Sequence, residues 1–84
     1  MAIPADHTMI WAEVYTGIPG RPKTKCLNYG WCAFPKQMTF DQAAERAKAH
    51  LKRQHGQKAL VLTYPMDRVG KGFRASDPII GVFG

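Results

Sequence analysis

The sequence predicts a small α+β domain, with one amphipathic helix packed on one face of a small antiparallel sheet in the order β-β-α-β-β. Only the segment 39–56 combines helical periodicity with a start and a stop signal, and short apolar runs typical of strands lie on both sides of it. The chain has 84 residues, of which 45% are hydrophobic, and this suits a folded domain with a modest core. We therefore expect one domain over residues 1–84, with residues 1–8 as a short N-terminal arm.

The predicted helix begins with a capping box. The Thr39 hydroxyl accepts from the amide of Gln42, whose side chain reaches back to the amide of Thr39. Gly56 supplies a left-handed end, and the basic residues of the last turns complement the helix macrodipole. Five residues within one arc of the helical wheel predict a core-facing stripe, namely Phe40, Ala43, Ala44, Ala47 and Leu51.

Four apolar runs predict the strands. In the first run Trp11, Glu13 and Tyr15 point to one side and aliphatic residues point to the other, which is typical of a half-buried strand. The first two runs predict an antiparallel hairpin, and the composition of the third suits a central strand. The four predicted strands are Met9–Thr16, Cys26–Phe34, Lys58–Tyr64 and Pro78–Phe83.

The net charge of +6 is the strongest indication of function. A basic surface favours polyanions, so we expect the partner to be nucleic acid or an acidic or nucleic-acid-binding protein. No apolar run approaches the roughly 20 residues of a membrane span. The N-terminus lacks the charged and apolar regions of a secretory signal. These features predict a cytoplasmic protein without a membrane partner.

Two loops, 17–25 and 66–77, concentrate positive charge among glycines and prolines. If the strands pair as a meander, both loops lie on the same edge of the sheet and contact phosphates without reading sequence. The alternative is two separate loops whose charge serves solubility. The candidate partner-binding residues of these loops are Arg21, Lys23, Lys25, Arg68, Lys71, Phe73 and Arg74.

The sheet face opposite the helix is a second candidate surface. If aliphatic residues of the first strand face the helix, Trp11 and Tyr15 face outward, and Tyr29 and Trp31 join them when the second strand has the matching orientation. Exposed aromatic side chains beside basic loops suit stacking of unpaired bases, and they suit protein binding equally well. The alternative is burial in the core, which we expect for Trp31, whereas we expect Tyr15 to be exposed.

The sequence has no recognisable catalytic or metal-binding signature. Cys26 and Cys32 lie too far apart for a disulfide if they share one continuous strand, whereas a turn between them would bring them together. Free thiols are the expected state in the cytoplasm. The histidines, His7, His50 and His55, show neither metal-ligand spacing nor pairing with an orienting carboxylate. We expect no enzyme activity, metal, cofactor or small-molecule substrate.

These features predict a non-enzymatic binding protein that engages nucleic acid or a nucleoprotein complex through its two basic loops. The alternative is a small protein-binding modulator or inhibitor, such as a phage-type accessory protein that blocks a larger host complex through an aromatic and basic surface. A third hypothesis is a homodimer joined through edge strands.

Overall fold

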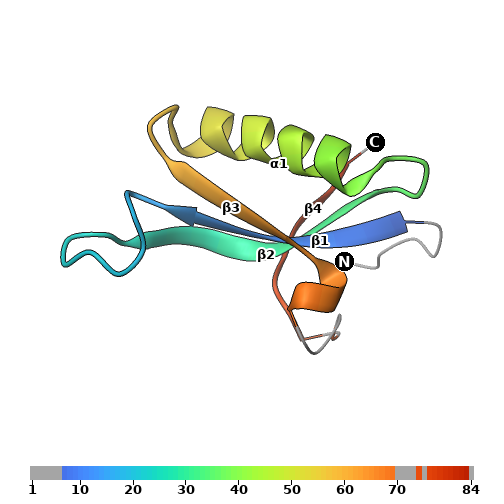
Figure 1. The fold of residues 1–84 in the computed structure, drawn as a ribbon, viewed down its shortest axis with the longest axis horizontal. Helices are drawn as coiled ribbons and strands as arrows, with labels where there is room; N and C mark the ends of the chain where they lie inside the picture. Colours follow the sequence, from blue (N-terminus) through green and yellow to red (C-terminus); the bar gives the residue numbers. More distant parts are fainter. Residues whose placement is uncertain (1–6, 70–73, 75, 84) are drawn as a thin grey trace.

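The computed structural model describes residues 7–69, 74 and 76–83, and it confirms an α+β fold with one helix and a four-stranded sheet (Figure 1). A short 3-10 turn follows the third strand. The ends of the predicted elements shift by one or two residues. The elements are β1 (His7–Tyr15), β2 (Cys26–Pro35), α1 (Phe40–His55), β3 (Leu60–Pro65), the 3-10 turn η1 (Met66–Arg68) and β4 (Ile79–Val82).

The strand order in the sheet is β3-β1-β2-β4. β1 runs antiparallel to both β2 and β3, whereas β4 runs parallel to β2, so the sheet is mixed. The predicted antiparallel hairpin of the first two strands is confirmed, whereas the prediction of an antiparallel sheet is wrong for β4. The strands also do not pair as a meander, which was the condition for placing the two basic loops on one edge. α1 carries the chain from β2 past β1 to β3, because two strands of the same direction need a long crossover between them. β3 is consequently an edge strand, although its apolar composition predicted a central one.

β3 lies at one edge of the sheet and β4 at the other, and η1, which follows β3, lies on the face opposite α1 (Figure 1). Val69 packs against the cluster of Met9, Trp31 and Ala33, and the indole Nε1–H of Trp31 donates to Asp77 at 3.0 Å. The backbone N–H of Trp31 donates to the Pro78 carbonyl at 2.9 Å. Gly30, with φ +153°, allows this approach, because a Cβ there would lie 2.8 Å from that carbonyl oxygen.

The main core lies between α1 and the sheet. Ile10, Ala12 and Val14 of β1 are buried there against the small residues of α1 and against Leu51. Alanine side chains on the buried side of α1 allow the helix to approach the sheet closely. Phe40 departs from the predicted stripe: it is 37% exposed and lines an open hollow together with Ile10 and Pro65.

The N-terminal cap of α1 is as predicted, whereas its C-terminal cap differs. The Gln42 amide donates to the Thr39 hydroxyl at 3.2 Å, and the Thr39 amide donates to the Gln42 side chain at 3.0 Å. Gly56 has a positive φ of 109° and donates its N–H to the Lys52 carbonyl, but its ψ of 147° lies outside the left-handed helical region. The helix therefore stops at glycine by a different backbone geometry from the one predicted.

A second, smaller core lies on the other sheet face. It contains Met9, Trp31 and Ala33, with Trp11 and Val69 packed against them. Val69, Asp77 and Pro78 therefore cover one half of this face, next to the first residues of β1. The other half, toward the hairpin between β1 and β2, lies outside this cluster.

Candidate binding surface

One end of the molecule brings together the ends of four elements. Tyr15, the last residue of β1, pairs with Leu60, the first residue of β3, and with Cys26, the first residue of β2. Asn28 Nδ2 lies 3.3 Å from His55 Nε2, so the last turn of α1 reaches the same end. The hairpin loop 16–25 extends from this end (Figure 1).

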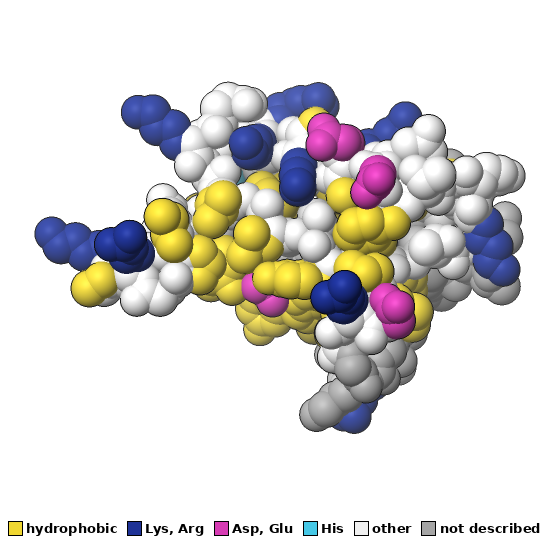
Figure 2. Space-filling model, in the orientation of Figure 1, with side chains coloured by type: hydrophobic (Ala, Val, Ile, Leu, Met, Phe, Trp, Pro, Cys, Tyr) yellow, Lys and Arg dark blue, Asp and Glu magenta, His cyan; other side chains and the backbone are white. Residues whose placement is uncertain are grey.

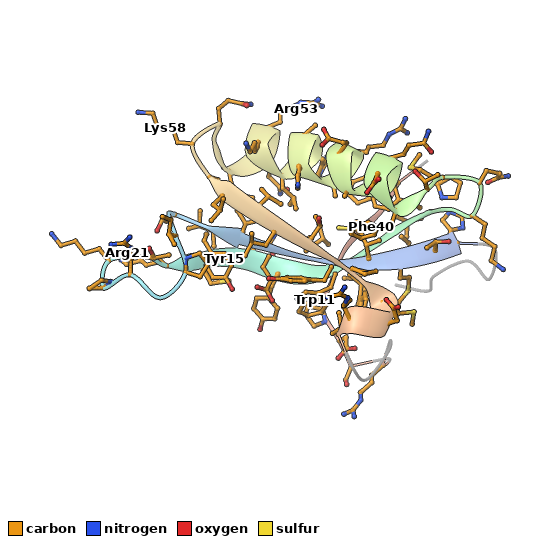
Figure 3. The ribbon with its side chains drawn as sticks, in the orientation of Figure 1. Trp11, Tyr15, Arg21, Phe40, Arg53 and Lys58 are labelled. Atoms are coloured by element: carbon orange, nitrogen blue, oxygen red, sulfur yellow. The ribbon has the colours of Figure 1, made fainter. Side chains whose placement is uncertain are left out.

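Half of the chain's 12 lysines and arginines belong to these segments. Figure 3 shows Arg21 on the hairpin loop and Lys58 on the segment after α1 at this end of the molecule, while the side chain of Arg53 lies above α1. Figure 2 shows Lys and Arg side chains projecting there beside a band of hydrophobic side chains. We call this region the basic end, and its residues are Arg21, Lys23, Lys25, Lys52, Arg53 and Lys58.

Hydrogen bonds between the two ends of the hairpin loop fix its shape. Thr16 donates its backbone N–H to the Lys25 carbonyl and accepts from the Lys25 N–H on its hydroxyl, both at 2.9 Å. The Thr24 hydroxyl donates to the Ile18 carbonyl at 2.8 Å. The loop therefore holds its cationic side chains in solvent on a backbone that is already ordered.

The two stretches of sequence that supply the basic end contain no carboxylates. The sequence contains no Asp or Glu between Val14 and Phe40, or between Arg46 and Met66, and these two stretches supply the whole basic end. Part of the cluster complements the C-terminal end of the α1 dipole. The cations of the hairpin loop have no such role. Because these stretches contain six cations and no carboxylate, they concentrate positive charge.

The half of the helix-distal face next to the basic end is open to solvent. Glu13 lies opposite Tyr29 on β2 and opposite Leu62 on β3, and directly opposed residues share a face. Tyr29 is 53% exposed. We call this half the open face, and its residues are Trp11, Glu13, Tyr15, Leu27, Tyr29, Leu60, Leu62 and Tyr64.

Trp11 joins the open face to the covered half. Its ring lies 5.9 Å from that of Tyr29, tilted by 44°, and 5.1 Å from that of Trp31 in an edge-to-face contact. Figure 3 shows Trp11 and Tyr15 on the side of the sheet away from α1. Both side chains are half-buried, whereas Trp31 is buried as predicted. The aromatic rings therefore form a continuous surface rather than isolated exposed side chains.

A carboxylate lies in the middle of this aromatic surface. Glu13 Oε2 accepts from the indole Nε1–H of Trp11 at 2.8 Å, and Glu13 Oε1 accepts from the hydroxyl of Tyr15 at 2.7 Å. The hydrogen bond to Glu13 and burial raise the pKa of Tyr15 to about 12. Tyr15 is therefore a fixed neutral donor, and both oxygens of Glu13 are held in place.

The structure separates the two basic loops that the sequence placed together. β3 ends at Pro65 opposite Ile10, whereas the hairpin loop begins after Tyr15, about 17 Å further along β1. Arg68 and Arg74 are exposed but belong to the connection under the sheet. Lys71 and Phe73 lie outside the described residues.

Sequence reasoning missed two parts of the surface. Tyr64, opposite Trp11, was not among the candidate residues, although the alternation of Leu60, Leu62 and Tyr64 places all three on one face. Lys58 was assigned to the third predicted strand, and the last-turn cations of α1 were attributed to the helix dipole. Only the pairing of β1 with β3 shows that they lie beside the hairpin loop.

A further hollow lies toward the other end of the molecule. It has a volume of about 560 Å³ and is lined mostly by apolar side chains, including Ile10, Phe40, Pro65 and Met66. It forms because β3 stops opposite Ile10, while β1 continues toward its N-terminus.

The cysteines and histidines of the described residues do not form a joint site. Cys26 is exposed and Cys32 is buried, both are free thiols, and burial raises the pKa of Cys32 to about 12. The ring of His50 packs against Phe83 with centroids 4.8 Å apart. Within residues 7–69, 74 and 76–83, no three His, Cys, Asp or Glu side chains are grouped closely enough to hold a metal ion.

Comparison with protein-family models, curated proteins and solved structures finds no match to this chain. In the part of the chain that the structure describes, no helix is long and apolar enough to cross a membrane. The function is therefore inferred from the chemistry of the surface alone.

Proposed function

We propose that this chain is a non-enzymatic binding protein for single-stranded nucleic acid, either free or within a nucleoprotein complex. The observation that carries the proposal is the junction of the basic end with the open face. A strand that crosses this junction meets cations for its phosphates and aromatic rings for its bases within one continuous surface.

The basic end supplies the electrostatic part of the binding. Its six cations come from the hairpin loop, α1 and the segment before β3, and no carboxylate of those stretches competes with phosphate for them. Release of condensed counterions from the nucleic acid then favours association, and this contribution falls as salt is added. Binding by this end alone does not depend on base sequence.

The open face favours single-stranded nucleic acid over a duplex. Tyr29 is more than half exposed, and Trp11, Tyr15 and Tyr64 surround Glu13 with further rings on the same face. Stacking of a base on an aromatic ring contributes about 1–3 kcal/mol. A duplex keeps its base faces stacked inside the helix, so it would contact the cations and leave these rings unused.

A salt titration with a fluorescent oligonucleotide tests the proposal. For single strands log Kobs changes with log salt by about −0.7 for each phosphate neutralised, so engagement of all six cations gives a slope of about −4. The double variant Arg21→Ala, Lys23→Ala should reduce the magnitude of the slope by about 1.4. A matched control is Lys36→Ala, Arg46→Ala, which removes the same charge from exposed positions outside the basic end.

Three results would contradict the proposal. They are an affinity that does not depend on salt, an equal effect of the two double variants, and a preference for duplex over single strands. Each would show that the junction of the basic end with the open face is not the binding surface.

A second candidate function is binding of a protein partner, as a modulator of a larger complex. The apolar hollow beside Ile10 favours it, because Phe40 and Met66 line this hollow and are 37% and 39% exposed. Nuclease-treated lysate should then contain a protein that is retained by the wild-type chain and lost by Phe40→Ala. Retention by both chains, or by neither, would contradict a role for the hollow.

A further inference from the structure

Glu13 is the only acidic residue in the four strands, and it lies in the middle of the surface that stacks bases in the proposed function. A carboxylate repels phosphate, so nonspecific binding of nucleic acid gives no reason for its position. Its neighbours across the sheet are Tyr29 and Leu62, and neither side chain carries a charge that would neutralise it.

The hydrogen bonds of Glu13 leave part of the carboxylate available to a ligand. One oxygen accepts from Trp11 and the other from Tyr15, at 2.8 and 2.7 Å. An ionised carboxylate oxygen accepts more than one hydrogen bond. Each oxygen therefore keeps a further acceptor position, and the two existing bonds fix the direction of both. The result is a preorganised pair of acceptors on an aromatic surface.

A hollow beside Glu13 gives these acceptors a ligand site. It has a volume of about 220 Å³ and is lined by Trp11, Glu13, Tyr64, Arg68 and Val69. Drug-sized ligands occupy roughly 300–1,000 Å³, so this hollow suits a smaller group, of the size of one base. Its aromatic walls favour a planar ligand. Arg68 in the same hollow disfavours a cationic ligand, because like charges repel.

We propose that Glu13 selects an unpaired guanine. The ligand has to be planar and uncharged and has to present two adjacent donors, one for each oxygen. Guanine carries the N1–H and the exocyclic N2 amino group side by side on its Watson–Crick edge, which is accessible only in single strands. Adenine and cytosine offer one amino group there, and thymine and uracil offer one ring N–H. This inference rests on the proposed function and assigns it a base preference.

Oligothymidylates of about ten nucleotides with one substituted position provide the test, read by anisotropy. Guanine at that position should increase affinity about tenfold over thymine, since hydrogen bonds to a charged acceptor are among the stronger ones. Hypoxanthine, which keeps N1–H and lacks the amino group, should lose most of this gain. Because these comparisons use the wild-type chain, they do not depend on whether a variant folds.

Substitution of the carboxylate tests its role directly. Glu13→Gln should abolish the guanine preference, so that the guanine-containing oligonucleotide and plain oligothymidylate bind this variant with equal affinity. Glu45→Gln is the control, since it changes the net charge equally on the exposed side of α1 and should retain the preference.

Each outcome decides between the two proposals. Binding of all the oligonucleotides with equal affinity, or a guanine preference that survives Glu13→Gln, overturns the role of Glu13 and leaves the proposed function intact. Absence of binding to any of them at low salt overturns both.

Discussion

Tyr29 and Trp31 lie two residues apart on the same face of β2, yet Tyr29 is 53% exposed and Trp31 only 1%. Val69, Asp77 and Pro78 contact the half of the face that contains Trp31, and among the described residues none of these contacts reaches Tyr29. Strand alternation thus determines which face a side chain occupies. The path of a distant connection determines whether that face becomes core or binding surface.

Of the substitutions that test this difference, Trp31→Ala should have the largest effect on the free energy of unfolding. It removes a buried indole and its hydrogen bond to Asp77, and large-to-small substitutions of this kind cost about 3–5 kcal/mol of the free energy of unfolding. Chemical denaturation followed by circular dichroism measures the loss. A loss below about 1 kcal/mol would mean that the connection does not cover this half of the face.

Gly30→Ala should have the next largest effect on the free energy of unfolding. The new Cβ would lie 2.8 Å from the Pro78 carbonyl oxygen, and φ at this position is +153°, so the entry to β4 has to shift. We expect a loss of about 1–3 kcal/mol in the free energy of unfolding. Gly20→Ala is a matched control, because Gly20 also has positive φ but nothing lies within 4 Å of its Cβ position. Equal losses in the two variants would indicate strain alone rather than a contact with β4.

Low pH should weaken the contact between Asp77 and Trp31, with a smaller effect on stability than the two substitutions above. The hydrogen bond from Trp31 holds the pKa of Asp77 below its usual range, and the backbone N–H and charge of Arg74 act in the same direction. Because the folded-state pKa is lowered, this stabilisation is complete above the unfolded-state pKa of about 3.9 and is lost as pH falls through the folded-state value. Thermal unfolding of wild type and Asp77→Asn should converge at low pH. A constant difference in Tm would contradict this role.

Tyr29→Ala should have the smallest effect on stability and a clear effect on binding. A substitution at an exposed position changes the free energy of unfolding by about 0.5 kcal/mol or less. Loss of one stacking ring should weaken oligonucleotide binding by about 1–3 kcal/mol. The same two measurements on Trp31→Ala should give the opposite balance. Unchanged oligonucleotide affinity in Tyr29→Ala would remove the open face from the proposed binding surface.

Local patterns predicted those parts of the fold that depend on neighbours in sequence. The capping box of Thr39 and Gln42 and the buried alanines of α1 follow from helical spacing alone. Alternation placed Trp11 with Tyr15 in β1 and Tyr29 with Trp31 in β2, and the pairing of Trp11 with Trp31 shows that these two aromatic faces coincide. Among the site residues, Arg21, Lys23 and Lys25 were identified from the composition of their loop, and the structure places them at the basic end.

Relations between distant segments were not predictable in this way. Pairing of β4 with the outer edge of β2 depends on the approach of Pro78 to Gly30, 48 residues away in the chain. The same pairing order moves the end of β3, and Arg68 after it, away from the hairpin loop of Arg21 and places Lys58 at the same end of the molecule as that loop. No window of sequence contains that information.

The sequence by itself determined that this chain has one amphipathic helix, four strands with their faces, and an excess of positive charge without a catalytic signature. These properties follow from periodicity, capping and composition, which act within a few residues. Only the tertiary structure decided that the cations of the hairpin loop and of α1 share one end, and that Glu13 lies among aromatic rings opposite Tyr29. Strand order depends on how whole elements cover each other's apolar faces, and these elements are distant from one another in the sequence.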